Sequence, residues 1–169
     1  MRSLLIAAAV FVAMAIEAAL AFRHEQTQRA RGGTEPPGDV YNMMRITYPA
    51  AFLSMIAEGL WRGLPSRAWL IGGALVFAAA KALKWWAIAA LGDFWTFRVI
   101  VIPGARLVCA GPYRYLRHPN YVAVAGELVA VALMTGAIVA GPIATIAFGV
   151  LLLKRIAIEE RALERARNE

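Results

Sequence analysis

The chain has 169 residues, of which 60% are apolar and only 17% are charged, and its mean hydropathy is +0.58. This composition excludes a disordered chain, and a single cysteine, Cys109, excludes a disulfide framework. The formal charge of +7 would suggest a nucleic-acid partner for a soluble protein. In so apolar a chain the basic residues indicate a membrane instead, and we expect no nucleic acid as a partner.

The apolar runs of the first half predict three transmembrane helices. Residues 3–22 are long enough to cross a bilayer, and they are longer than the apolar region of a typical signal peptide, the alternative that Ala19-Leu20-Ala21 suggests. Residues 23–41 are polar and predict a loop. The second and third spans are predicted at residues 42–60 and 68–91.

The next segment, residues 92–119, does not fit a membrane helix. It holds four arginines together with several prolines and glycines, which indicates an aqueous or interfacial segment. We therefore divide the chain into a three-helix membrane region, residues 1–91, and a second region, residues 92–169.

A helical hairpin is predicted after this segment. Residues 121–153 are apolar apart from Glu127, but as one helix they would be about 50 Å long, too long for a single crossing. Gly136 and Gly141-Pro142 interrupt the run near its middle. The predicted arms are residues 120–135 and 142–165. The fold class is thus an all-α integral membrane protein with about five transmembrane helices.

The basic residues predict how the helices are oriented. With five crossings, only Arg2, Arg62 and Arg67 lie on one side, and the other fifteen of the 18 lysines and arginines lie on the opposite side. Lysine and arginine gather on the cytoplasmic side of membrane proteins. We therefore expect residues 92–119 and the C-terminus in the cytoplasm and the N-terminus outside.

Two polar stretches carry the candidate chemistry. The first runs from Leu107 to Tyr121, and its composition alone also fits an interfacial belt of basic and aromatic residues. The second stretch is residues 154–163. Its Arg155 and Glu159 are four residues apart and share one helix face, as in an ordinary surface ion pair. The hairpin returns this pair to the membrane side at which His118 lies.

Together the two stretches resemble the isoprenylcysteine carboxyl methyltransferase family of integral membrane enzymes. The family pattern is Leu-Val, Gly-x-Tyr, Arg-His-Pro-x-Tyr and a later Arg-Ile-x-x-Glu-Glu-x-x-Leu. This sequence has Leu107-Val108, Gly111-Pro112-Tyr113, Arg117-His118-Pro119-Asn120-Tyr121 and Arg155-Ile156-Ala157-Ile158-Glu159-Glu160-Arg161-Ala162-Leu163. The resemblance covers roughly residues 91–163, and both blocks occur in order around the hairpin.

The resemblance implies a methyltransferase that uses S-adenosylmethionine, with a cofactor-binding segment in the cytoplasm and a lipophilic acceptor that enters from the membrane lipids. It implies that Arg155 faces the acceptor. The cofactor-binding residues that it implies are Leu107, Val108, Tyr113, His118, Pro119, Asn120, Tyr121 and Glu159. These residue types suit the cofactor, because tyrosine faces stabilise a sulfonium cation and a carboxylate accepts hydrogen bonds from an amine or from ribose hydroxyls.

Glu127 bears on the identity of the acceptor. A carboxylate inside a membrane is usually functional or paired, and the structural alternative is a bond to Lys81 or Lys84. As a general base, Glu127 would serve a phenol or enol acceptor, whereas a carboxylate acceptor needs no base. The chain is most similar to short bacterial members, some of which resemble enzymes that O-methylate alkylresorcinols or alkylpyrones. We therefore expect such an acceptor in a bacterial inner membrane, ahead of an isoprenylcysteine-type carboxylate.

Three other functions compete with this one. A sterol-reductase-like membrane enzyme would use NADPH and would need a phosphate clamp, which the arginines of residues 92–119 imitate. A phospholipid N-methyltransferase would place a cationic acceptor beside Arg155, which is unfavourable. A membrane protein without catalytic activity would bind no cofactor. No metal site is expected, because two distant histidines and one cysteine do not form one.

Overall fold

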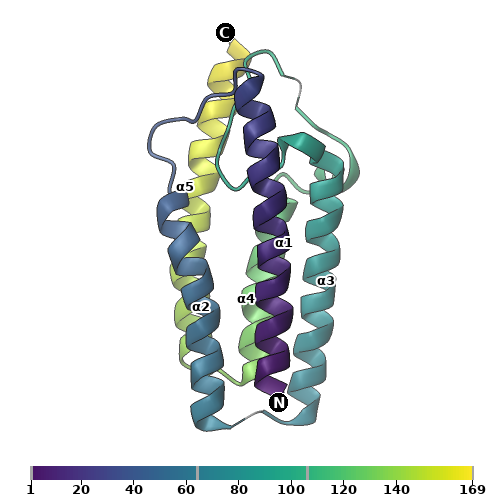
Figure 1. The fold of residues 1–169 in the computed structure, drawn as a ribbon, viewed down its shortest axis with the longest axis vertical. Coiled ribbons are helices and arrows are strands. Elements are labelled where there is room, and N and C mark those ends of the chain that lie inside the picture. The colour runs from purple at the N-terminus through teal and green to yellow at the C-terminus, as the bar shows by residue number, and fades with distance from the viewer. Residues whose placement is uncertain (1, 64, 106, 169) are drawn as a thin grey trace.

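The computed structural model describes residues 2–63, 65–105 and 107–168, and over these residues it is all-helical, without a β-strand. The five α-helices lie side by side along one long axis (Figure 1). They are α1 (Arg2–Ala30), α2 (Tyr41–Arg62), α3 (Arg67–Leu91), α4 (Pro119–Thr135) and α5 (Ala140–Asn168), with two short 3-10 helices, η1 (Gly92–Phe94) and η2 (Gly111–Arg114), between α3 and α4. The predicted all-α fold is confirmed for the described residues.

The first helix is longer than the sequence predicted. Residues 23–30 continue α1 instead of forming a loop, and the loop prediction for them is wrong. Nδ1 of His24 lies 2.9 Å from the carbonyl oxygen of Trp95, and the side-chain amide of Gln28 donates to the carbonyl of Asp93 at 2.9 Å. These tertiary contacts stabilise helical turns that a polar composition alone does not favour.

The next two helices follow the predicted spans closely. Both α2 and α3 begin and end within two residues of those spans, and the short turn between them follows Gly63, whose φ is +85°. Glycine adopts this backbone conformation without strain, which explains why α2 ends there.

The predicted hairpin is present as α4 and α5. Pro119 is the first residue of α4, where its fixed φ suits a helix and its missing N–H is not needed. At the other end Gly136 has a φ of +69°, and its N–H donates to the carbonyl of Ala132. This left-handed glycine ends α4 and turns the chain toward α5.

A carboxylate from α2 caps the start of α5. Glu58 accepts hydrogen bonds from the N–H groups of Val139 and Ala140, at 3.1 and 2.6 Å. We expect Glu58→Gln to lower the melting temperature in detergent by a few degrees, because the amide lacks the charge that complements a helix N-terminus. Glu164→Gln on the exposed part of α5 is the matched control. Equal melting temperatures for the two variants would contradict this assignment.

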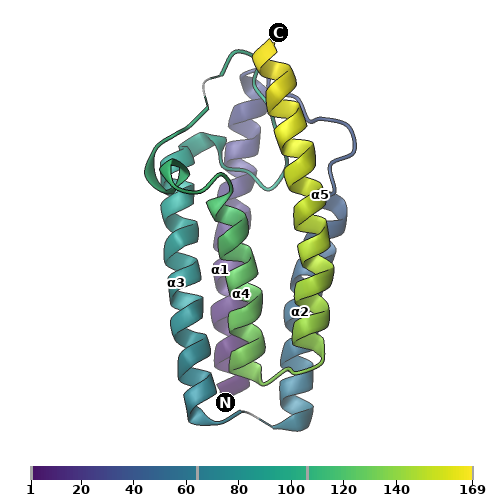
Figure 2. The same cartoon turned by 180° about the vertical axis from the view of Figure 1, so that it is seen from behind.

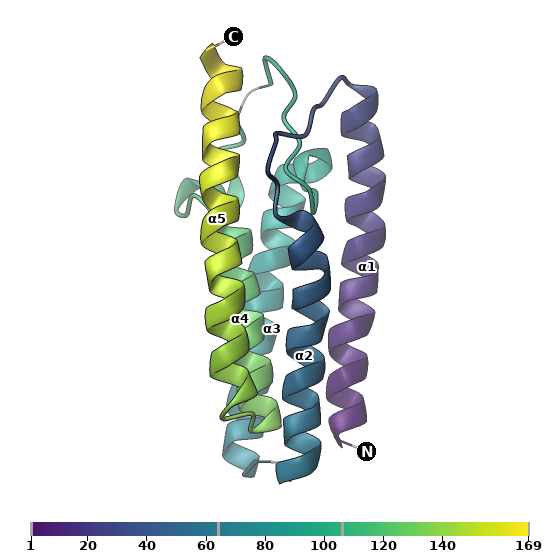
Figure 3. The same cartoon turned by 90° about the vertical axis from the view of Figure 1, so that its left-hand side faces the viewer.

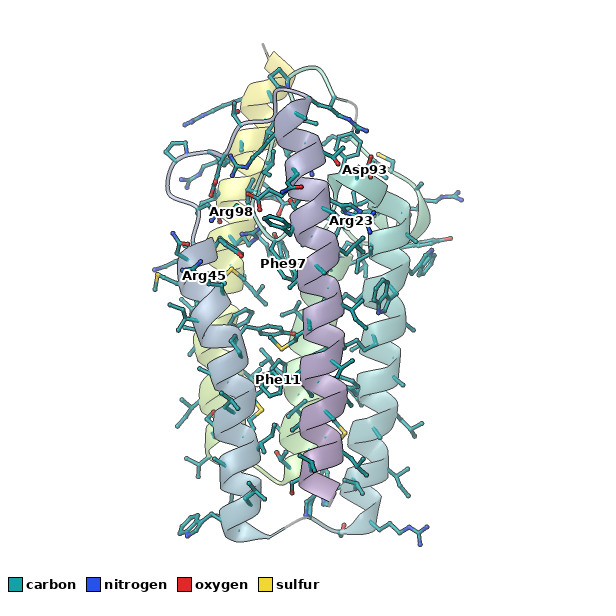
Figure 4. All side chains as sticks on the ribbon, viewed as in Figure 1. Phe11, Arg23, Arg45, Asp93, Phe97 and Arg98 are labelled. Atoms are coloured by element: carbon teal, nitrogen blue, oxygen red, sulfur yellow. The ribbon has the colours of Figure 1, made fainter. Side chains whose placement is uncertain are left out.

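The two ends of the bundle differ. One end carries the N-terminus and the short turns α2–α3 and α4–α5, and the other carries residues 31–40, residues 92–118 and the C-terminus (Figures 2 and 3). We call the second one the loop end. Arg23, Asp93 and Arg98 lie there, whereas Phe11 lies among the apolar side chains between the helices (Figure 4).

The helix α4 forms the centre of the bundle. It contacts each of the other four α-helices, and it packs most extensively against α3. A Cβ atom on Gly73 of α3 would lie 2.8 Å from the carbonyl oxygen of Ala130, so glycine permits this close approach. The core side chains Phe52 and Met55 of α2 and Leu128 and Val131 of α4 are fully buried.

The outer surface of the bundle suits a bilayer. Three helical stretches, Ser3–Ala30, Arg67–Phe94 and Ala140–Ala166, are long and apolar enough to cross a membrane. Less than a third of each is buried inside the protein, so most of their apolar side chains face outward, as expected for an integral membrane protein. The helix α4 is apolar but shorter, and a crossing by each of the five helices remains a prediction.

Candidate active site

Polar side chains from distant parts of the sequence meet at the loop end. The segment after α1 runs beside the segment after α3, and Thr34 and Val101 form an isolated antiparallel β-bridge between them. Arg98 is paired with Glu35 at 2.8 Å and stacks over the ring of Tyr41 at 4.4 Å. These contacts hold the two loops to each other and to the start of α2.

The two arms of the hairpin meet through three polar side chains. Tyr121, in the first turn of α4, donates its hydroxyl hydrogen to the carboxylate of Glu159 on α5. Nε of Arg155, one helical turn before Glu159, donates to the same Tyr121 oxygen at 3.0 Å. The structure therefore brings together three residues that the sequence singled out from two separate motifs.

Arg155 is almost completely buried and has an acidic partner. Its Nη1 donates to Oδ1 of Asp39 at 2.9 Å, and the side chains of Arg155 and Asp39 are only 5% and 3% exposed. The second carboxylate oxygen of Asp39 accepts from the N–H of Val99 at 3.0 Å. Asp39 thus fixes the guanidinium from outside the hairpin, and among the described residues Nη2 of Arg155 makes no hydrogen bond.

The histidine motif lies beside this group. The ring of His118 stacks on that of Tyr121, with centroids 5.4 Å apart, and its Nε2 lies 3.2 Å from Oε1 of Glu160. The side-chain oxygen of Asn120 accepts from the indole N–H of Trp95 at 3.3 Å. Residues 118–121 are therefore held from two sides, by α5 and by the segment that follows α3.

The remaining predicted residues surround the group less tightly. Burial raises the pKa of the Tyr113 phenol, and the negative charge of Glu159 raises it further, so Tyr113 stays protonated at neutral pH. Pro119 is buried at the start of α4. Leu107 and Val108 lie in the loop before η2, where Leu107 is exposed and Val108 is half-buried.

Glu127 lies apart from these residues, in a second polar group deep in the bundle. We call this group the buried charge cluster: Glu17, Lys81, Lys84 and Glu127, together with Tyr48. Glu127 accepts a hydrogen bond from the Tyr48 hydroxyl at 2.7 Å, and its two oxygens each lie 3.1 Å from a lysine nitrogen, of Lys81 and of Lys84. These contacts are the ones that the structural alternative for Glu127 requires.

The cluster joins four helices with no net formal charge. Lys81 donates to Glu17 at 2.6 Å, and Lys84 lies 2.7 Å from the other oxygen of the same carboxylate. Glu17, Lys84 and Glu127 are at most 2% exposed. Two carboxylates and two ammonium groups therefore compensate one another in the interior of the bundle.

Three residues of the loop-end site were not predicted from the sequence as site residues, namely Asp39, Trp95 and Glu160. Asp39 and Trp95 belong to neither motif block, and Glu160 lies in the second block but was assigned no role. All three reach the site through the tertiary fold. Among the described residues no cluster of histidine, cysteine and acidic side chains suitable for a metal ion is present.

The fold and the site define an integral membrane protein that builds one polar site where a helical hairpin emerges from the apolar part of the bundle. Residues 73–165 match the profile of the isoprenylcysteine carboxyl methyltransferase (ICMT) family, and the chain belongs to this family. The family resemblance seen in the motifs is thus confirmed, and membership indicates a membrane methyltransferase.

Two bacterial proteins are similar along most of their length. The chain is 34% identical over 160 residues to YpbQ, an uncharacterized protein of Bacillus subtilis (strain 168), and the match covers 95% of both chains. It is 23% identical over 145 residues to an uncharacterized protein of Haemophilus influenzae, which covers 85% of this chain and 84% of the other. No solved structure matches the chain.

Proposed function

We propose that the protein transfers a methyl group from S-adenosylmethionine to an oxygen atom of a lipophilic acceptor at the cytoplasmic membrane face. The observation that carries the proposal is the meeting of Tyr121, Glu159 and Arg155 across the hairpin, within the residues that match the family. The acceptor that we favour is a phenol or enol of the alkylresorcinol or alkylpyrone type, ahead of an isoprenylcysteine-type carboxylate.

The donors and acceptors at the loop end fit S-adenosylmethionine. When bound, the cofactor supplies a methyl group on a sulfonium centre. Glu159 would accept from its amine or ribose hydroxyls, and His118 would donate to its carboxylate or adenine. The faces of Tyr113 and Tyr121 suit the cation and the adenine ring. Asn120 and Pro119 at the start of α4, with Leu107 and Val108 before η2, complete the proposed cofactor site.

Arg155 is the proposed acceptor-binding residue. Its contacts with Asp39 and Tyr121 use Nε and Nη1 and leave Nη2 for an anionic oxygen of the acceptor. A cationic amine beside this buried guanidinium is unfavourable, which argues against a phospholipid amine. Arg98, which would belong to an NADPH phosphate clamp, is instead paired with Glu35.

Ligand binding and product analysis test the proposal together. S-adenosylhomocysteine is expected to raise the melting temperature of the purified protein, and NADPH is expected to leave it unchanged. Radiolabelled S-adenosylmethionine is expected to transfer its methyl group into a total lipid extract, with the product identified by mass spectrometry. Stabilisation by NADPH but not by S-adenosylhomocysteine would overturn the proposal in favour of a reductase.

One substitution, Glu127→Gln, distinguishes a general base from a purely structural role for Glu127. Glu127→Gln is expected to lower the melting temperature in either case, because the charge that faces Lys81 and Lys84 is lost. If Glu127 is also a general base, the variant slows turnover of a phenol acceptor and spares a carboxylate acceptor. If Glu127 only neutralises the lysines, both acceptors are affected alike, so the ratio of the two turnover rates decides between these roles.

Labelling of the exposed Cys109, the one cysteine of the chain, tests the proposed orientation of the protein in the membrane. We expect a membrane-impermeant maleimide to label Cys109 in inverted membrane vesicles and not in intact cells, because we propose that residues 92–119 lie in the cytoplasm. A variant with Cys109→Ser and Ser66→Cys, in the turn at the opposite end of the bundle, should show the reverse pattern. Labelling of Cys109 in intact cells would reverse the orientation.

A further inference from the structure

An open groove of about 770 Å³ lies between α2 and α5, on the outside of the bundle. A groove of this size is large enough for a small organic ligand. Small side chains line most of it. Its lining includes Thr47, Ser54 and Glu58 of α2 and Ala144, Ala147 and Phe148 of α5.

Three polar side chains that line the groove, those of Thr47, Ser54 and Glu58, are already satisfied within the protein. The hydroxyl of Thr47 donates to the carbonyl of Met43, and that of Ser54 donates to the carbonyl of Ala51, both within α2. Glu58, at the end away from the site, accepts from the backbone at the start of α5. The groove therefore offers an apolar surface to whatever lies in it, and an apolar chain is the chemistry that fits it.

The groove points toward the candidate active site. Ala144, Phe148 and Arg155 are four and seven residues apart, so they follow one face of α5. Phe148 lies at the groove, and Arg155 is about 10 Å farther along the helix axis toward the loop end. From Thr47 to Glu58 the groove extends for about 16 Å, which accommodates a hydrocarbon chain much longer than a few carbons.

We propose that this groove holds the hydrocarbon tail of the methyl acceptor while its oxygen-bearing head lies at Arg155. This inference rests on the proposed function and adds to it the place of the tail. The bilayer is as apolar as the groove, so the tail gains little free energy by leaving the lipid. The groove acts instead by orienting the head, which favours reaction through position.

Filling the groove tests this role. In Ala147→Phe a phenyl ring occupies the lining, and Ala79→Phe on the exposed face of α3 is the matched control. For pentadecylresorcinol we expect Ala147→Phe to lower kcat/KM by about tenfold, and for pentylresorcinol we expect little change. Binding of S-adenosylhomocysteine should be unchanged in both variants. Equal losses for the long and the short resorcinol would overturn the proposal.

A labelling experiment locates the tail without requiring turnover. Pentadecylresorcinol with a diazirine near the end of its chain is expected to label residues 47–61 or 139–148 of the wild-type protein, and Ala147→Phe should remove this label. Label elsewhere overturns the groove assignment. So does a dimer of the wild-type chain that Ala147→Phe dissociates, because the groove would then hold a second copy. If S-adenosylhomocysteine does not bind at all, the proposed function fails, whatever the label shows.

Discussion

Replacing Lys84 by methionine is expected to lower the free energy of unfolding by about 3–5 kcal/mol, because one partner of a buried ion pair is then missing. Lys84 lies 2.7 Å from Glu17 and 3.1 Å from Glu127 and is almost completely buried. Without it, two carboxylates share the single charge of Lys81. A loss of this size is a large part of the stability of most proteins. Urea or thermal unfolding in detergent micelles measures it.

A second substitution provides the control. In the double variant Lys84→Met with Glu17→Gln, the remaining groups are Lys81 and Glu127, which lie 3.1 Å apart and have no net charge. We expect the double variant to be more stable than Lys84→Met alone, although one more polar contact has been removed. If the losses of the two single variants simply add, the four groups do not compensate one another as described.

The second large effect concerns α5, on which we expect Glu159 to bind the cofactor and Arg155 to bind the acceptor. We expect Glu159→Ala to weaken the binding of S-adenosylhomocysteine by about 10–100-fold, since a charged hydrogen-bond acceptor is lost. Arg155→Ala is expected to leave this affinity largely intact and to reduce acceptor turnover. Calorimetric titration and methyl-transfer kinetics measure the two effects, with Arg161→Ala on the exposed face as control. Equal losses of cofactor affinity in both variants would contradict the division.

Asp39 provides an independent check of the same assignment. Because its carboxylate holds Nη1 of Arg155 at 2.9 Å, Asp39→Asn should reproduce the kinetic pattern of Arg155→Ala in milder form. The amide has the same shape but keeps only one acceptor oxygen, so it can accept from the guanidinium or from the N–H of Val99 but not from both, and it lacks the opposite charge. A variant that loses cofactor binding instead would place Asp39 in the cofactor site.

The sequence was sufficient for elements with clear boundaries. Pro119 and Gly136 mark the two ends of α4 as local sequence rules require, so the hairpin was predicted closely. The end of α1 was not, because His24 and Gln28 continue the helix by contacting residues 71 and 65 positions away in the chain. Such contacts have no local signal.

The residues of the candidate site were likewise predicted only in part from the sequence. Residues 118–121 and Glu159 carry motif patterns, and the hairpin alone brings them to one membrane side. Asp39 carries no pattern and arrives from the loop before α2, outside the residues that match the family profile. For Glu127, a bond to Lys81 or Lys84 was one of the two alternatives that the sequence left open. The sequence did not predict that Glu17 shares both lysines.

The buried charge cluster also constrains how the chain enters the membrane during its synthesis. Glu17 emerges from the ribosome 64 residues before Lys81, and Glu127 follows only after both lysines. At a synthesis rate of about 5–20 residues per second, several seconds or more pass between the synthesis of Glu17 and that of its partners Lys81 and Lys84. An unpaired carboxylate at the centre of a helix disfavours insertion by about 3 kcal/mol. We therefore expect α1 to remain beside the insertion machinery until α3 arrives, so that the two helices enter the lipid together.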